Sequence, residues 1–192
     1  EKRTSVLSML WDGEIHGFPR RFGRIIDRVI DQSSQLVLVS RLTQPLATTT
    51  RILLVCPPLC HLLPEVTEAI SVVKTIAKQS GARLCLLLAA TARQEQLSLV
   101  EKCRPAVDMA VQEVPSWRQV CAAIADETSE NDWVVVLAAR TGQVAWQPLL
   151  DRLPRLLLGT LVNNNLSFLY PPLEAPDLHE DHEITTDDAE LS

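Results

Sequence analysis

The stretch that decides the fold is Arg51-Ile-Leu-Leu-Val-Cys-Pro-Pro58, followed by an amphipathic segment from Leu63 to Ser80 and a second apolar run from Arg83 to Ala90. The two apolar runs are typical of buried strands. The segment between them is typical of a helix, because its aliphatic residues recur every three or four positions. Strands joined by a helix lie parallel, since parallel neighbours need a long crossover connection. This stretch therefore predicts an α/β fold with a parallel sheet.

The same alternation continues downstream to residue 172. The further predicted elements are a helix over Gln94–Cys103, a strand over Val107–Val114, a helix from Ser116 to about Thr128, a strand over Trp133–Ala139, a helical region from Trp146 that Pro154 interrupts, and a last strand over Leu166–Tyr170. Together they predict a five-stranded parallel sheet flanked by helices, with Rossmann-like topology, in a domain of residues 51–172.

Upstream of this domain the chain holds only part of a similar unit. Val6–Trp11 is expected to be a strand remnant, Phe22–Ile30 carries an apolar stripe at helical spacing, and Leu36–Val39 is a predicted strand. We therefore expect residues 1–44 to be the end of a preceding α/β domain and residues 45–50 to be a linker. The acidic residues 173–192 are expected to be a disordered tail, because they lack apolar side chains to bury.

Composition narrows the classes of function. The 192 residues carry a net charge of −6 and 46% hydrophobic residues. No basic stripe is present that could neutralise phosphates, so nucleic acid is not an expected partner. No apolar stretch reaches the roughly 18 to 20 residues of a membrane helix. The five cysteines are expected to be free thiols, and no metal-ligand spacing is recognisable, so no metal is expected.

The predicted topology places any ligand where the first and fourth strands of the domain end. Those ends are Val55-Cys56-Pro57-Pro58 and Ala138-Ala139-Arg140-Thr141-Gly142. Neither end carries an acidic side chain that could bind a ribose hydroxyl. The sequence also shows no Ser/His/Asp arrangement and no paired carboxylates, so we expect no catalytic activity.

The order of the elements, the loop after Trp133–Ala139 and the pair Gly159-Thr160 resemble the universal stress protein family. In nucleotide-binding members the first strand ends in Asp, and the fourth is followed by a Gly-x2-Gly-x9-Gly-Ser/Thr loop. The resemblance places Cys56 or Pro57 at the Asp position, Gly142 at the first glycine, and Gly159 and Thr160 at the final pair. With Arg140, which could meet an anion, the residues Pro57, Arg140, Gly142, Gly159 and Thr160 are the candidate nucleotide contacts.

The chain departs from that motif in ways that disfavour a nucleotide. Ala145-Trp146 stands where the middle glycine would let phosphates approach, and Pro57-Pro58 removes two amide donors from the opposite wall. We therefore expect a member without a cofactor that uses the fold for packing or signalling. The alternative is a free-standing universal stress protein that binds ATP or another adenine nucleotide.

A narrower resemblance involves Ala139–Pro154 and Ser167–Pro172, which are similar to the cytoplasmic tail of cation/proton antiporters of the sodium:hydrogen exchanger type. In these proteins tandem stress-protein-like domains follow the membrane bundle. Trp11–Glu14, Phe18–Ile30 and Leu36–Arg41 are similar to the end of the first of the two domains. The resemblance implies a regulatory, non-catalytic domain at the cytoplasmic face, attached to the membrane domain of the same parent chain. Such domains dimerise through the last strand, which predicts a homodimer with Leu166 to Tyr170 as its edge.

Overall fold

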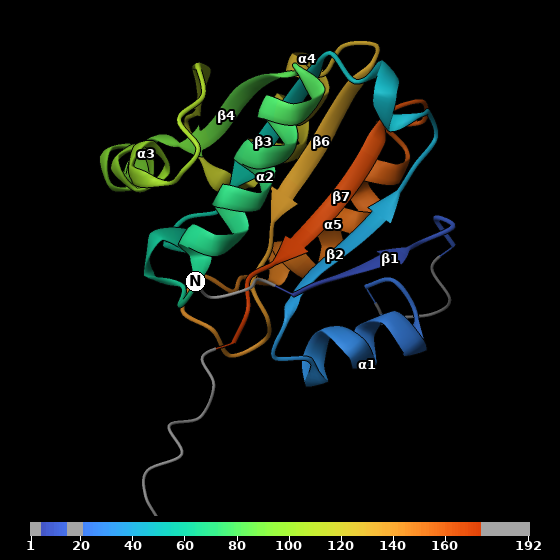
Figure 1. Cartoon of the computed structure of the whole chain (residues 1–192). Helices are drawn as coiled ribbons and strands as arrows, with labels where there is room; N and C mark the ends of the chain where they lie inside the picture. The colour runs from blue at the N-terminus through green and yellow to red at the C-terminus, as the bar shows by residue number, and fades with distance from the viewer. Residues whose placement is uncertain (1–4, 15–20, 174–192) are drawn as a thin grey trace, which may run out of the picture.

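Strands and helices alternate along the described parts of the chain, residues 5–14 and 21–173 of a computed structural model (Figure 1). In chain order the strands and α-helices are β1 (Val6–Leu10), α1 (Arg24–Gln32), β2 (Leu36–Arg41), β3 (Arg51–Cys56), α2 (Val66–Ser80), β4 (Arg83–Ala89), α3 (Arg93–Lys102), β5 (Met109–Val114), α4 (Val120–Glu127), β6 (Asp132–Leu137), α5 (Pro148–Leu158) and β7 (Asn165–Tyr170). Short 3₁₀ turns lie at Leu46–Thr48, Cys60–Leu62, Ala90–Ala92 and Trp117–Gln119.

All the strands in the described part of the chain belong to one sheet with the order β1-β2-β7-β6-β3-β4-β5. Neighbours are parallel throughout, except that β2 runs antiparallel to β7. The five strands β5-β4-β3-β6-β7 have their first strand in the centre, which is the order of a doubly wound Rossmann-like sheet. The prediction of an α/β fold with a mainly parallel sheet is therefore confirmed.

The predicted number of strands is wrong, because residues 5–14 and 21–173 alone contribute seven strands to the sheet rather than five. The two extra strands are β1 and β2, which come from residues 1–44 and continue the same sheet instead of lying apart from it. Leu36, Val37 and Val39 of β2 are fully buried there. An apolar run indicates burial but does not identify its neighbour, so the sequence could not show that β2 packs on β7.

The strand β7 lies inside the sheet, so the predicted dimer edge at Leu166 to Tyr170 is wrong. Every residue of β7 is buried, with β6 on one side and β2 on the other. At the seam between β2 and β7, the buried hydroxyls of Ser40 and Ser167 lie 2.7 Å apart and share a hydrogen bond. Trp133 of β6 also donates its indole N–H to the Ser167 hydroxyl at 2.8 Å. The backbone edge that a second copy would need is thus already occupied.

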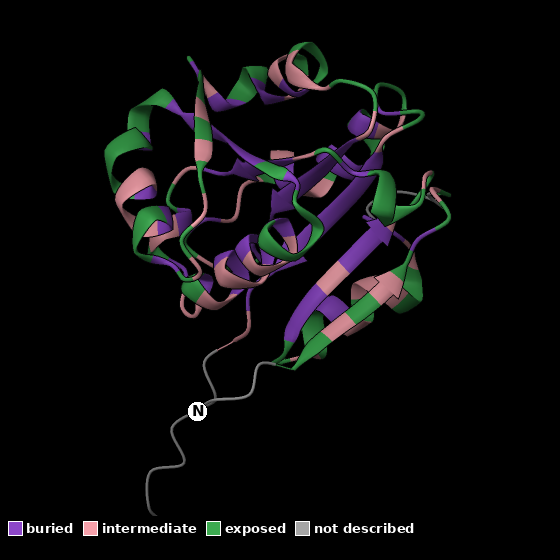
Figure 2. Ribbon diagram, turned by 45° about the horizontal axis from the view of Figure 1, so that its top comes forward, coloured by how far each residue is buried: buried purple, intermediate pink, exposed green. Residues whose placement is uncertain are grey.

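Helices cover both faces of the sheet (Figure 1). On one face α2 buries Ala69, Ile70 and Val73 against β3 and β4, and α3 packs beside it. On the other face α4 packs against α5. Both faces of the central strands are therefore buried, whereas β1 at the end of the sheet is partly exposed along its length (Figure 2).

Several predicted boundaries need adjustment. Pro154 lies inside α5, which continues past it to Leu158, and its ring is buried. The helix therefore runs on although proline offers no N–H for the bond to the residue four positions earlier. The predicted linker at residues 45–50 contains the 3₁₀ turn Leu46–Thr48. The helix α2 is capped at its C-terminal end by Gly81, whose φ of 72° lies in the left-handed region. The expected acidic tail lies outside the described residues, apart from residue 173.

Candidate functional site

The carboxyl ends of β3 and β6 lie side by side, because the two strands are parallel neighbours in the centre of the sheet. The chain leaves β3 toward α2 on one face and leaves β6 toward α5 on the other (Figure 1). This is the topological switch point at which open α/β sheets bind ligands. The two strand ends that the sequence predicted to be neighbours therefore lie together. What this place could bind depends on the two loops.

The loop after β3 is bound by the Gln96 side chain of α3. Pro57 is buried, and its carbonyl accepts hydrogen bonds from the fully buried Gln96 amide at 2.5 Å and from the Cys60 backbone N–H at 3.2 Å. Pro57 and Pro58 offer no backbone N–H. The Gln96 amide also donates to the Cys60 sulfur at 3.4 Å. This wall of the crevice therefore has its polar groups directed into the protein.

The loop after β6 closes on itself. The Arg140 backbone N–H donates to the side-chain oxygen of Gln143 at 2.7 Å, and the Gln143 N–H donates back to the Arg140 carbonyl at 3.0 Å. Gly142 is exposed with φ of 91°, and a Cβ added to it would meet no atom within 4 Å. Gly142 is thus the one candidate residue at this edge with open space around it.

The Arg140 side chain points away from the crevice and toward the end of α1. Its guanidinium donates to the carbonyls of Ile30 at 2.8 Å, Ser33 at 3.2 Å and Gln35 at 3.1 Å, and also to the carbonyl of Pro171. The side chain is only 4% exposed, and burial lowers its pKa. Because its donors are used on backbone carbonyls, Arg140 does not present a cation to a ligand at the switch point.

Gly159 and Thr160 lie at the opposite edge of the sheet, which corrects their grouping with Gly142. They follow α5, which returns the chain to the amino end of β7. The neighbouring carbonyl of Leu161 accepts a hydrogen bond from Arg41 at 3.0 Å, close to that edge. A six-residue strand spans about 20 Å, so the pair cannot complete a phosphate loop with Gly142. Glycine spacing alone could not show that a whole helix separates them.

The position of the expected middle glycine is filled. The Ala145 methyl group is fully buried, and the Trp146 indole donates to Asp151 of α5 at 3.0 Å. Both side chains therefore pack the loop onto α5. The side chains that stand in place of the middle glycine therefore attach the loop to α5 and leave no space there for phosphates.

The thiols near the crevice are protected. Cys56 and Cys60 are fully buried, and a hydrogen bond with Cys60, together with burial, raises the pKa of the Cys56 thiol. A thiol with a raised pKa is a poor nucleophile, because the thiolate is the reactive form. Within the described residues no group of three or more His, Cys, Asp or Glu side chains is placed to hold a metal ion.

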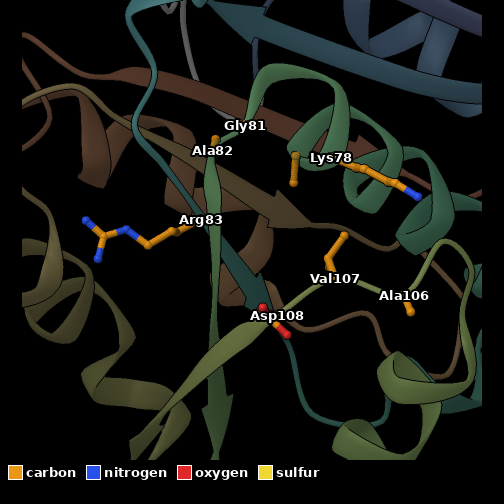
Figure 3. Close-up of a pocket in the computed structure, with 8 residues that line it drawn as sticks. Lys78, Gly81, Ala82, Arg83, Ala106, Val107 and Asp108 are labelled. Carbon is orange, nitrogen blue, oxygen red and sulfur yellow. The ribbon is translucent and has the colours of Figure 1, made fainter.

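A cleft of 430 Å³ opens at the amino ends of β4 and β5, away from the switch point. Lys78, Arg83 and Asp108 contribute its charged side chains (Figure 3). Lys78 and Arg83 extend in opposite directions, so their cationic groups do not converge on one point. The cleft therefore lacks the clustered charge of an anion site.

Two groups of interacting residues were not predicted from the sequence. Lys74 of α2 is 1% exposed, and its ammonium donates to the carbonyls of Val100 at 3.0 Å and Cys103 at 2.6 Å, at the end of α3. Lys74 stands four residues after Ile70 and three before Ala77, which both belong to the apolar stripe of α2. This spacing could have indicated that Lys74 is buried. The other group surrounds Arg21, which is 6% exposed and contacts Asp31 at 2.5 Å and Asp151 at 3.8 Å.

Comparison with known proteins bears on the fold. No family model matches the chain, and no curated protein matches it. A crystal structure of a functionally unknown protein from Pseudomonas aeruginosa PAO1 is similar, with a TM-score of 0.50 and 14% sequence identity. The similarity covers 86% of this chain and 63% of that one, so the chain spans less than two thirds of the other protein. The likeness is one of fold.

No helix among the described residues combines the length and the apolar character needed to cross a membrane.

Proposed function

We propose that this chain is a non-catalytic, universal-stress-protein-like regulatory domain of a sodium/proton antiporter, located at the cytoplasmic face of the membrane. The observation that carries the proposal is the seam at which β2 joins β7 in antiparallel pairing. A strand–helix–strand unit from residues 1–44 meets the five-stranded unit there, as expected for the end of one stress-protein-like domain followed by a second. The resemblance of both segments to antiporter tails supplies the function.

The closed switch point supports a role in contact rather than chemistry. Pro57 is capped by Gln96, Ala145 is buried, and Arg140 is bound to backbone carbonyls. In the proposed mechanism the domain biases the attached transporter between states through self-association or binding of an effector. Such a bias requires different binding free energies in the two states. Because β7 is covered by β2, self-association would use a surface other than Leu166 to Tyr170.

The test uses the full-length product of the gene. The coding sequence upstream of Glu1 should specify about ten to twelve apolar spans of roughly 20 residues. Sodium/proton exchange should be measured in membrane vesicles with the intact protein and with a variant that ends before Arg51. We expect the truncation to shift the pH and sodium dependence of exchange while transport persists. Unchanged pH and sodium profiles would falsify the regulatory role.

The second candidate is a stress-type protein that binds an adenine nucleotide, and the space around Gly142 favours it. Thermal melting with and without ATP and Mg²⁺ separates the two proposals. A ligand present at a hundred times its dissociation constant adds about 2.7 kcal/mol to the free energy of unfolding, which raises the melting temperature by several degrees. We expect no such shift, and a clear rise would favour the nucleotide-binding protein.

A further inference from the structure

The unit β1–α1–β2 repeats the unit β6–α5–β7 in its backbone pairing. Val6 of β1 pairs with Leu36 of β2, as Trp133 of β6 pairs with Asn165 of β7. At matching points farther along, the Trp11 N–H donates to the Ser40 carbonyl and the Ala138 N–H donates to the Leu169 carbonyl, each at 2.8 Å. The two units thus have the same register between their strands.

The helices of the two units repeat as well. Ile25-Ile-Asp-Arg28 lies in the first turns of α1, and Leu149-Leu-Asp-Arg152 lies in the first turns of α5. Each aspartate binds the residue five positions before it. Asp27 accepts from the Phe22 N–H at 3.1 Å, and Asp151 accepts from the Trp146 indole at 3.0 Å. Since β2 and β7 are antiparallel, an approximate two-fold axis at their seam relates the units.

The two units differ in what lies beyond their outer strand. The outer edge of β6 is paired in parallel with β3, and α2 covers the adjoining face. Among the described residues nothing pairs with the outer edge of β1. Val6 and Leu10 are 42% and 73% exposed, whereas their repeat partners Trp133 and Leu137 are 4% and 0% exposed. The exposed surface of β1 therefore matches a surface that is buried in the other unit.

The helix α1 is uncovered in the same way. Ile25 is 76% exposed. The equivalent residue of α5 is Leu149, which packs against the core. On that side of the sheet α5 is also in contact with α4. Beside Ile25 a groove of 330 Å³ lies at the end of β1. Its apolar lining is Leu10, Trp11, Phe22, Ile25 and Ile26, and Asp12, Glu14 and Arg24 line it as well. An edge strand with exposed aliphatic side chains beside such a groove is a surface suited to strand addition.

We propose that a second α/β unit completes the sheet at β1, with a parallel aliphatic strand placed on β1 as β3 is placed on β6 and a helix covering Val6 and Leu10 as α2 covers Trp133. The repeat argues for a parallel neighbour. A second copy of this chain related by a two-fold axis in the sheet would bring β1 against β1 in antiparallel pairing. This inference deepens the proposed function by naming the partner surface, and in the proposed tandem the preceding stress-protein-like unit supplies the strand.

The direction of the β1 amides provides a matched pair of variants. The Trp11 N–H points toward β2, and amides alternate along a strand, so the Met9 N–H also points toward β2 and the Ser8 N–H points to the free edge. Proline removes the N–H and is tolerated on an edge strand where that N–H faces outward. Ser8→Pro therefore blocks the proposed pairing, and Met9→Pro breaks the pairing with β2.

The experiment compares the 192-residue chain with the full-length gene product by amide hydrogen exchange and thermal melting. In the 192-residue chain Ser8→Pro should leave the melting temperature within about 2 °C of the unchanged protein, and Met9→Pro should lower it by more than 4 °C. In the full-length product the amides of Val6 and Leu10 should exchange at least about a hundredfold more slowly than in the 192-residue chain. Ser8→Pro should abolish that protection.

Two results would overturn the inference. One is equally fast exchange of the Val6 and Leu10 amides in both proteins. The other is protection that appears in the 192-residue chain itself as its concentration rises, which would identify a second copy as the occupant. Neither measurement involves ion transport. The inference can therefore survive a failed transport assay, and the regulatory proposal can survive an open β1 edge.

Discussion

The Arg140 guanidinium connects parts of the chain that are far apart in sequence. It donates to carbonyls at the end of α1 and before β2, and to Pro171 after β7. The Cζ atom of Arg140 lies 5.9 Å from the centre of the Tyr170 ring, and the Cζ atom of Arg21 lies 5.8 Å from it. The bonds to Ile30 and Pro171 are buried, so loss of the guanidinium would leave these two carbonyls without a donor.

Replacing Arg140 with alanine should therefore lower the free energy of unfolding by about 3 kcal/mol, as expected when buried carbonyls lose their donors. Urea denaturation measures the change. Arg155→Ala is the matched control, because Arg155 is exposed on α5, and its effect should stay within about 0.5 kcal/mol. Equal losses in the two variants would show that the Arg140 hydrogen bonds contribute little.

Lys74 predicts a pH dependence of stability. Burial lowers the pKa of Lys74 in the folded state below the ordinary value of 10.5. Between those two values the unfolded chain binds more protons than the folded one, so stability increases as the pH rises through this range. The neutral amine can still donate to Val100 and Cys103.

The wild-type protein should therefore gain stability relative to Lys74→Met as the pH rises from 7 toward 10.5. Urea denaturation of both proteins at several pH values measures this difference, in which other titrating groups cancel. The control variant Lys78→Met removes an exposed lysine from the same helix. The explanation fails if the stability difference for Lys74→Met is independent of pH or is matched by the control.

At the scale of elements, the seam between β2 and β7 rests on a short polar network within an apolar surface. Ser167 bonds both the Ser40 hydroxyl and the Trp133 indole, and all three side chains are buried. Removing the Ser167 hydroxyl would leave both the Ser40 hydroxyl and the Trp133 indole without this partner. Removing the Ser40 hydroxyl would leave the Ser167 hydroxyl still bonded to the Trp133 indole. The two strands are therefore coupled by specific side chains as well as by backbone pairing.

Ser167→Ala should cost about 2 kcal/mol of unfolding free energy and Ser40→Ala about 1 kcal/mol. A double-mutant cycle by urea denaturation should give a coupling energy of about 0.5 to 1.5 kcal/mol between the two positions. Additive effects, with a coupling below about 0.3 kcal/mol, would mean that the two hydroxyls do not interact across the seam.

At the scale of the whole molecule, β2 is part of the central sheet rather than an appendage. It is hydrogen-bonded on both sides, and Leu36, Val37 and Val39 are inaccessible to solvent. Opening β2 alone would expose these side chains together with one side of β7. We therefore expect β2 to unfold with the core of the protein.

Native-state hydrogen exchange in low concentrations of denaturant tests this cooperativity. The slowest amides of β2 and β7 should open with the same free energy, equal to that of global unfolding. The outward amide of Ser8 serves as an internal reference for fast exchange at a free edge. If β2 opened at a free energy several kcal/mol below that of β7, residues 36–41 would form a separate, weaker unit.

The sequence by itself determined the helices and strands and the class of the fold. The spacing of apolar residues and the residues that end helices and strands are local features of the chain. The apolar run Arg51–Cys56, the helix that Gly81 ends and the run at Arg83–Ala89 were all expected close to their observed bounds. It also indicated two features that disfavour a nucleotide in the crevice, since proline lacks a donor and Ala145 adds a methyl group wherever they lie.

Only the tertiary structure decided which elements are neighbours. Strand pairing joins segments far apart in the chain, and an apolar run fits many partners equally well. For this reason β2 could be recognised as a strand but not as the antiparallel neighbour of β7, and Gly159 could be matched to a motif although a helix carries it to the other edge. The direction of Arg140 was decided in the same way, because its carbonyl partners come together only when the two units pack.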